Sequence, residues 1–265
     1  MSETAVLLED RGVVRVAGPE STVFLQGLIT NDVEKLAEGQ WRYAALLTPQ
    51  GKILFDFLIF RAGAEEFLLD APADKIADLA KRLGFYKLRA KVTISNESAA
   101  LAVVAAPEGE PADPRVPGLG ARRIVARDAA PPPDAQARAA YEARRIALGT
   151  PQGGVDFAYG DAFPHDANMD LVNGVDFAKG CYVGQEVVSR MKHRGGIRKR
   201  VVRVRLDGAV PAPGAAVLDG ELVIGGLGAA SGENALALLR LDRVEDAAKA
   251  GRPLTAAGVR VTVIE

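Results

Sequence analysis

The chain has 265 residues, with 33 Lys or Arg, 34 Asp or Glu, a formal net charge of −1 and one cysteine. This charge excludes a bulk polyanion binder, and one cysteine excludes an internal disulfide, a zinc finger and a self-contained metal-cluster site. No apolar run reaches the roughly 20 residues of a membrane span. Residues 1–10 lack the pattern of a secretory signal, so we expect a soluble cytoplasmic protein.

The first 148 residues alternate between strand and helix patterns. Strands are expected at 13–16, 41–48, 52–60, 67–70, 92–95 and 101–105, and the turn Pro49-Gln50-Gly51 predicts a hairpin between the second and third of them. Apolar residues at helical spacing predict helices from 18 to about 32, from 72 to 83, and from 134 to 148. Asp134 is expected to cap the last of these helices.

The remaining sequence predicts loops and then a β module. Residues 106–133 are rich in Pro, Gly and Ala and are expected to form loops around a short strand at 123–126, and residues 150–180 form a long segment without periodicity. A loop of that length within a compact domain is usually functional or disordered. After residue 198, short strands with Gly or Pro turns predict a small barrel, so the fold class is α+β.

The most informative segment is the octapeptide Lys179-Gly180-Cys181-Tyr182-Val183-Gly184-Gln185-Glu186, which contains the only cysteine. Two glycines frame Cys181, so the backbone there must turn sharply or approach another group closely. A glycine-framed loop beside positive charge is a typical setting for an accessible, reactive thiol. The octapeptide therefore predicts a functional cysteine.

A basic segment follows, with eight Lys or Arg and no acid between Arg190 and Arg205. Charged runs are usually solvated surface, but this density in a chain of net charge −1 indicates a local positive field. It suits a polyglutamate tail, a phosphate or RNA. The candidate contacts are Arg190, Lys192, Arg194, Arg198 and Arg200.

Asp56 is the second unusual residue, because it lies in the apolar strand pattern of residues 52–60. Alternation places Ile53, Phe55, Phe57 and Ile59 on one face, and Asp56 with its apolar neighbours on the other. A carboxylate in such a place is either paired with polar groups or lies in a ligand groove, where its pKa rises. Neither of the two histidines has a partner at metal-ligand spacing, so no metal site is expected.

Several segments together resemble the YgfZ family, the folate-binding relatives of the glycine-cleavage T protein, an aminomethyltransferase. The octapeptide matches the signature of that family. Residues 24–32, 47–56, 86–92 and 145–151 also resemble family segments, in the same order along the chain. The family is in turn related to mitochondrial factors that mature iron–sulfur proteins.

The resemblance implies a three-lobed fold around a folate groove, with lobes at 1–95, 96–195 and 196–265 and the barrel last. It implies tetrahydrofolate or a derivative as bound ligand, Asp56 and Cys181 as the chemically active residues, and no intrinsic metal. The implied cofactor contacts are Asn31, Asp56, Arg145, Thr150, Lys179, Tyr182, Gln185 and Glu186. Two differences weaken the match: Phe55 replaces the first of the two aspartates of the T protein, which argues against aminomethyl transfer, and Thr150 replaces a tryptophan of some relatives.

Three functions follow as hypotheses. The first is a folate-binding accessory protein of iron–sulfur cluster assembly or repair, with client enzymes such as those that thiolate tRNA. The second is a one-carbon transferase that acts on tetrahydrofolate through Asp56. The third is an RNA-binding module that uses residues 190–205. A thiol requirement at Cys181 separates the first hypothesis from the second, and a steep salt dependence of RNA affinity would identify the third.

Overall fold

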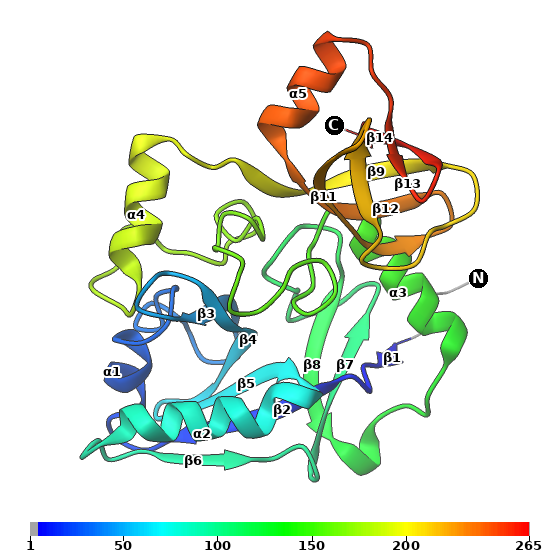
Figure 1. Cartoon of the computed structure of the whole chain (residues 1–265). Helices are drawn as coiled ribbons and strands as arrows, with labels where there is room; N and C mark the ends of the chain where they lie inside the picture. Colours follow the sequence, from blue (N-terminus) through cyan, green and yellow to red (C-terminus); the bar gives the residue numbers. More distant parts are fainter. Residues whose placement is uncertain (1–4, 265) are drawn as a thin grey trace.

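The computed structural model describes residues 5–264, apart from the side chain of Arg194, and contains three sheets (Figure 1). The largest is antiparallel, with strand order β3-β4-β5-β2-β6. Its strands are β2 (Arg11–Ala17), β3 (Trp41–Leu47), β4 (Ile53–Gly63), β5 (Glu66–Pro72) and β6 (Thr93–Asn96). Helices α1 (Ser21–Gln26) and α2 (Ile76–Lys87) cover one face and bury their apolar sides against it. A 3₁₀ turn, Ala73–Lys75, precedes α2.

The hairpin of β3 and β4 forms as the sequence predicts, but with a bulge between Leu46 and Leu47. An extra residue in one strand reverses the side-chain alternation beyond it. Ile53 therefore packs in a second core on the opposite face from Phe55 and Phe57, and its expected place beside them is wrong.

A smaller sheet with order β1-β7-β8 adjoins the first. It contains β1 (Val6–Leu7), β7 (Leu101–Ala106) and β8 (Ala121–Ala126), and a 3₁₀ turn, Arg127–Ala129, follows. Helix α3 (Ala135–Ala147) begins at the expected cap, because the Asp134 carboxylate accepts hydrogen bonds from the Gln136 and Ala137 amides at 2.9 and 3.0 Å. Ile146 at the end of α3 packs against Val201 and Leu236, which connects this helix to the C-terminal module.

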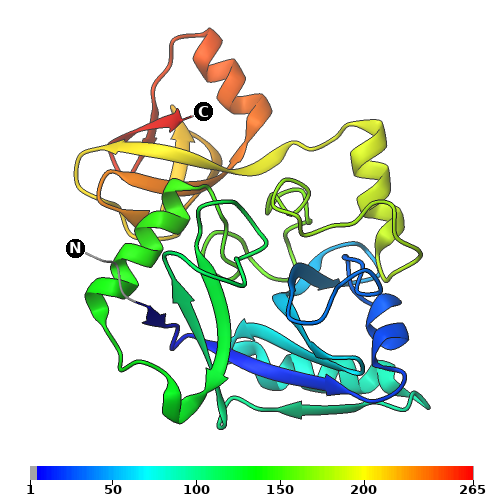
Figure 2. The same ribbon diagram turned by 180° about the vertical axis from the view of Figure 1, so that it is seen from behind.

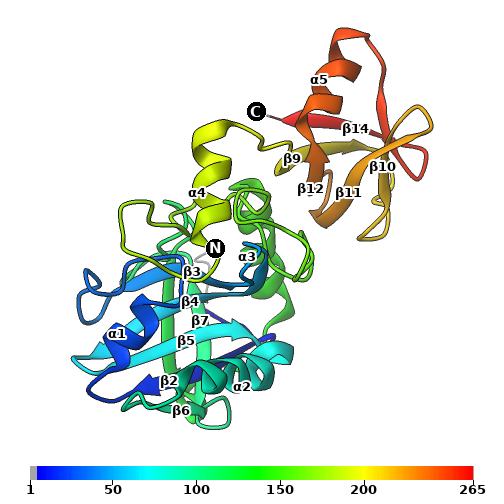
Figure 3. The ribbon, with the colours of Figure 1, turned by 60° about the vertical axis from the view of Figure 1, so that its left-hand side comes forward.

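The C-terminal module is a closed antiparallel barrel at one end of the molecule (Figures 1 and 3). Its strands are β9 (Lys199–Asp207), β10 (Ala216–Asp219), β11 (Leu222–Ser231), β12 (Asn234–Arg240), β13 (Leu254–Ala256) and β14 (Val259–Ile264), and helix α5 (Leu241–Lys249) follows β12. The barrel confirms the expected fold class. The boundaries expected at 95/96 and 195/196 stay a prediction.

Two helices differ from the sequence-based expectation. Helix α1 ends at Gln26, not near residue 32, because residues 27–32 turn back to form side-chain contacts with residues 173–179. Helix α4 (Gln185–Arg194) overlaps the start of the basic segment, where no helix was expected. Segment 150–180 contains none of the named helices and strands, as expected, and it runs between α3 and α4 (Figure 2). Among residues 5–264, none of the helices is long and apolar enough to cross a bilayer.

Candidate functional site

The loop that carries Cys181 is held in place by the buried side chain of Lys179. Its Nζ donates hydrogen bonds to the carbonyl oxygens of Gln26, Ile29 and Asn31, at 2.8, 2.6 and 2.9 Å. These carbonyls lie at the end of α1 and just beyond it, where the helix supplies no donor, so the ammonium satisfies them. Burial lowers the pKa of Lys179 to about 8, although nearby carboxylates, Asp32 first among them, oppose the shift.

The neighbouring side chains complete this connection between segments 26–32 and 173–179. The Asn31 amide donates to the carbonyl oxygens of Tyr43 and Asn173 at 2.8 and 2.7 Å. The Thr30 hydroxyl donates to the Gly174 carbonyl at 2.6 Å. We call these contacts, with those of Lys179, the 30–179 clasp. Lys179 and Asn31, predicted to bind a cofactor, thus use their polar atoms within the protein.

Cys181 lies at the surface, two residues after the clasp, and is a free cysteine. The next residue, Tyr182, is buried, and burial raises the pKa of its hydroxyl to about 12. Gly184 has φ = +82°, and a Cβ at this position would lie 2.5 Å from the Thr48 carbonyl oxygen. The glycine therefore lets the loop pack directly on the turn of the β3–β4 hairpin. Gln185 is half-buried and Glu186 exposed, both in the first turn of α4.

Asp56 is buried on β4 and accepts hydrogen bonds from two tyrosines. The Tyr43 hydroxyl donates to Oδ2 at 2.8 Å, and the Tyr159 hydroxyl donates to Oδ1. Burial, together with the Asp56 charge, raises the pKa of both tyrosines far above the ordinary value, so both remain donors. Asp56 is thus a buried carboxylate paired with polar groups. No pattern in the sequence pointed to Tyr159, which lies 103 residues away from Asp56.

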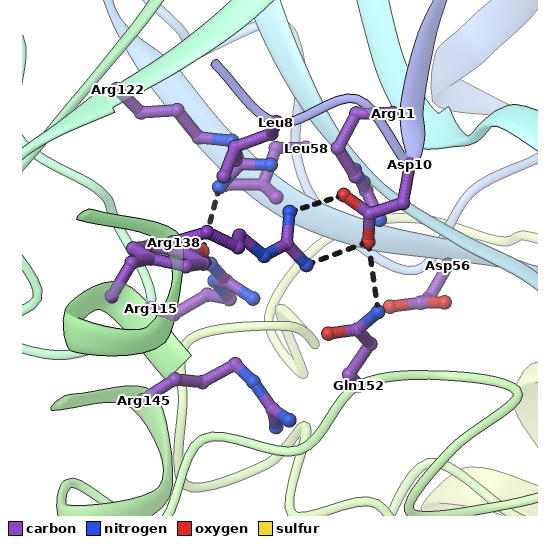
Figure 4. A pocket seen from close by; sticks show the side chains of 11 residues that line it. Leu8, Asp10, Arg11, Asp56, Leu58, Arg115, Arg122, Arg138, Arg145 and Gln152 are labelled. Carbon is purple, nitrogen blue, oxygen red and sulfur yellow. Dashed lines mark hydrogen bonds and ion pairs between the residues drawn. The ribbon is translucent and has the colours of Figure 1, made fainter. Parts of the chain in front are cut away.

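A small cavity of about 20 Å³ adjoins Asp56, which is room for about one water molecule. In Figure 4 the side chains of Arg138, Gln152 and Asp56 converge on it. Arg138 pairs with Asp10 at 2.5 Å, and Gln152 donates to the same carboxylate at 3.2 Å. The lining also contains four further arginines, Arg11, Arg115, Arg122 and Arg145. The described cavity at Asp56 is therefore far too small to hold a pterin without movement of its lining side chains.

Arg145 and Thr150, both predicted to bind the cofactor, contact each other. The Arg145 guanidinium donates to the Thr150 carbonyl and to the Asp156 carboxylate, each at 2.7 Å, and pairs with Glu142 at 2.9 Å. The charge of Asp156 raises the pKa of Arg145 against the opposing effect of burial. The Thr150 hydroxyl is buried and has no hydrogen-bond partner within residues 5–264. Arg145 thus fixes the end of α3 to the following segment.

The basic residues point in different directions. Arg190 is exposed on α4. The Lys192 ammonium lies 3.6 Å from the centroid of the Phe177 ring. Arg200 forms a bidentate ion pair with Asp170, with distances of 2.8 and 2.9 Å. Arg198 lines a separate cavity of about 190 Å³ with Lys52 and Lys199. The side chain of Arg194 lies outside the described residues. Within the described chain, none of these residues lines the Asp56 cavity, and no group of three or more His, Cys, Asp or Glu is placed to hold a metal ion.

Two segments of the chain match models of known protein families. Residues 8–108 match the family model of the GCVT N-terminal domain, and residues 198–265 match that of the CAF17 C-terminal beta-barrel domain. A crystal structure of glycine cleavage system aminomethyltransferase T from Bartonella henselae superposes with a TM-score of 0.75 at 18% identity, covering 98% of this chain and 84% of that one. This likeness establishes the aminomethyltransferase-like fold and nothing beyond the fold.

Three curated relatives carry one function in their names. The mitochondrial iron–sulfur cluster assembly factor IBA57 of Mus musculus is 34% identical over 91% of this chain and 79% of its own length. The human IBA57 is 32% identical, with 90% and 78% covered. The IBA57 homologue of Neurospora crassa is 36% identical over 77% of this chain, which spans 54% of that relative.

These relatives correct two expectations. They are IBA57 proteins, a sister group of YgfZ, so the resemblance to YgfZ holds for the shared fold and not for YgfZ itself. All three are named as mitochondrial proteins, which contradicts the cytoplasmic location expected from the sequence.

Proposed function

The chain belongs to the family of the IBA57 iron–sulfur cluster assembly factors, and we propose that it acts in iron–sulfur cluster assembly through the thiol of Cys181. The observation that carries this proposal is the exposed position of Cys181 beside the 30–179 clasp. The clasp fixes the backbone of the loop, while the thiol remains accessible to a second molecule. Thiolates are the usual protein ligands of iron–sulfur clusters.

The partner class follows from the number of ligands. A cluster usually takes four thiolates, and this chain contains one cysteine. We therefore propose that the cluster is cargo held mainly by a partner of the assembly machinery, and that Cys181 contacts it there. Enzymes that thiolate tRNA are proposed among the clients, and the level of thiolated tRNA nucleosides in a deletion strain measures this part.

The test is a Cys181→Ser variant in a strain that lacks the protein. Because the side chain is exposed, the melting temperature should stay unchanged, while rescue of iron–sulfur enzyme activity should be lost. The matched control is the double variant Cys181→Ser, Ser189→Cys, which restores a thiol on α4, away from the clasp. Full rescue by Cys181→Ser would refute the proposal, and rescue by the double variant would show that the position of the thiol is unimportant.

A second candidate function is binding of a reduced folate at Asp56. The buried Asp56 carboxylate at a small cavity favours it, because a carboxylate accepts hydrogen bonds from the amino and ring N–H groups of a pterin. The cavity holds about one water, so a pterin requires Arg138 and Gln152 to swing outward from Asp10.

Calorimetry with mono- and polyglutamylated tetrahydrofolate tests this candidate. Asp56→Asn should weaken binding by roughly 1–3 kcal/mol if a charge-assisted hydrogen bond is lost. Arg138→Ala, which opens the cavity, should preserve or strengthen the binding of tetrahydrofolate. Absence of binding heat in both the wild type and Arg138→Ala would exclude folate. Turnover with an aminomethyl donor would support a transferase instead.

A further inference from the structure

The turn that follows α2 holds an apolar side chain in a strained backbone conformation. Leu88 has φ = 42° and ψ = −106°, and the Ala90 amide donates to the Lys87 carbonyl at 2.7 Å, which closes a turn. These angles are near those of the first central residue of a type II′ turn, a position that glycine favours. The Leu88 side chain is 89% exposed. A strained residue that contributes nothing to the core points to a role at the surface.

A second large apolar side chain extends this feature. Phe85 lies in the last turn of α2, three residues before Leu88, and is 62% exposed. The apolar residues that α2 needs for packing are Ile76, Leu79 and Leu83, which are all buried in the core of the large sheet. Phe85 and Leu88 therefore form a surface patch that the fold itself does not require.

Positive charges flank the patch in the sequence. Residues 79–92 contain five cations, Lys81, Arg82, Lys87, Arg89 and Lys91, and no acid. None of the five forms an ion pair with any residue in the described range 5–264. Cations in the last turn of a helix stabilise its dipole, but Arg89 and Lys91 lie beyond the end of α2. This arrangement complements an anionic surface that also offers an apolar recess.

The end of α2 and the loop before α4 lie toward the same side of the molecule (Figure 1). Tyr86 and Ala90, which flank the patch, pack against the core cluster that also contacts Val183 of the Cys181 loop. In Figure 1 the end of α2 that leads to β6, helix α1 and the loop before α4 all lie on the left-hand side. One macromolecule bound at this side could contact both features.

From these observations we propose that Phe85 and Leu88 dock an acidic protein surface, with Leu88 as the apolar anchor and the five flanking cations as the charged contacts. The proposal rests on the function proposed above, because it identifies the docking surface for the partner that brings the cluster. A lipid surface fits less well. Helices that lie on membranes present a continuous apolar face, whereas the apolar face of α2 is buried and only two side chains remain.

The decisive variant is Leu88→Gly, which removes the anchor and relieves the strain. Glycine adopts this backbone conformation without strain. If Leu88 had no binding role, its replacement by glycine would therefore leave the protein equally stable and functional. Docking predicts an unchanged or higher melting temperature but rescue of iron–sulfur enzymes reduced about tenfold or more, as expected for loss of an apolar anchor. The matched control is Leu171→Gly at another exposed leucine, 65% exposed, which should retain rescue. Full rescue by Leu88→Gly overturns the proposal, and Cys181→Ser separately tests the function on which it rests.

A photo-crosslinking amino acid at position 88 gives a readout that does not depend on rescue. We expect one discrete crosslinked protein, with the attachment in an acidic segment, that disappears when Lys87 and Arg89 are both changed to Glu. Absence of any such product overturns the proposal. Co-sedimentation with phosphatidylglycerol–phosphatidylcholine vesicles serves as the second arm, and vesicle binding that is lost in Leu88→Gly would assign the patch to a membrane instead.

Discussion

The Lys179 ammonium lies 2.9 Å from the carbonyl oxygen of Asn31, and this contact joins two segments that are 148 residues apart in the sequence. It places an exposed thiol on a backbone that is anchored on one side by a buried cation. The same ammonium also binds the Gln26 and Ile29 carbonyls, so its removal would leave three acceptors without their donor.

Lys179→Met should therefore destabilise the protein by about 1–3 kcal/mol or more, the loss expected for buried acceptors without a partner. Urea unfolding at pH 7 measures the difference. The control is Lys192→Met, which removes an exposed cation that lies on the Phe177 ring. Equal stability of Lys179→Met and the wild type would show that the clasp does not need the ammonium.

The pKa of Lys179 predicts a pH dependence with a definite sign. Burial lowers this pKa from 10.5 to about 8 in the folded protein, so between these pH values the unfolded chain binds more protons than the folded one. The free energy of unfolding contributed by this group therefore rises with pH across that window. The stability difference between wild type and Lys179→Met should increase from pH 8 to pH 10, and a difference that stays constant or falls would contradict the assignment.

Gly184→Ala should disturb the Cys181 loop. A Cβ at Gly184 would meet the Thr48 carbonyl at 2.5 Å, and φ = +82° is unfavourable for alanine, so we expect a loss of about 1–3 kcal/mol and reduced rescue. Gly180→Ala is the matched control in the same loop, because a Cβ there has no neighbour within 4 Å. Thermal melting and rescue of iron–sulfur enzymes should both separate the two variants, and identical behaviour would count against the loop geometry.

The fold was largely predictable because its signals are local. The turn at Pro49-Gln50-Gly51, the Asp134 cap and the short strands after residue 198 each depend on residues near in sequence. Helix α4 was missed because its many charged residues were interpreted as an extended basic segment and its start depends on the left-handed Gly184.

The site was less predictable because its polar contacts join segments that are far apart in the sequence. The sequence singled out Asp56 and Cys181 as unusual, and the family resemblance added Asn31 and Lys179. The structure gives Asn31, Asp56 and Lys179 buried polar partners. Those partners come from segments far away in the chain, as Tyr159 does for Asp56. Residue type and spacing cannot tell whether a buried polar group faces a ligand or another part of the protein.

Tyr159→Phe should test the internal pairing of Asp56. The substitution removes one of two hydroxyl donors from a buried carboxylate, so the expected loss of stability is about 1–3 kcal/mol. Tyr86→Phe, at a half-buried tyrosine whose hydroxyl has no hydrogen bond to any other described residue, should change stability by less than about 0.5 kcal/mol. Urea unfolding measures the free energy of unfolding of both variants. Equally small losses would mean that the hydrogen bond from Tyr159 to Asp56 contributes nothing to stability.

Arg122→Met should be the most damaging substitution near the Asp56 cavity. Arg122 is buried, pairs with the fully buried Asp70, and also donates to the Tyr141 hydroxyl at 3.1 Å. Loss of one partner of a buried ion pair typically costs about 3–5 kcal/mol, because the remaining charge stays away from water. Arg11 still pairs with Asp70 at 2.6 Å, so we expect the lower end of that range. Arg123→Met, at the next residue, removes an exposed guanidinium with a single hydrogen bond to the Glu110 carbonyl, and should cost less than about 1 kcal/mol. A comparable loss in both variants, measured by urea unfolding, would show that the buried arginine network does not stabilise the junction of the two sheets.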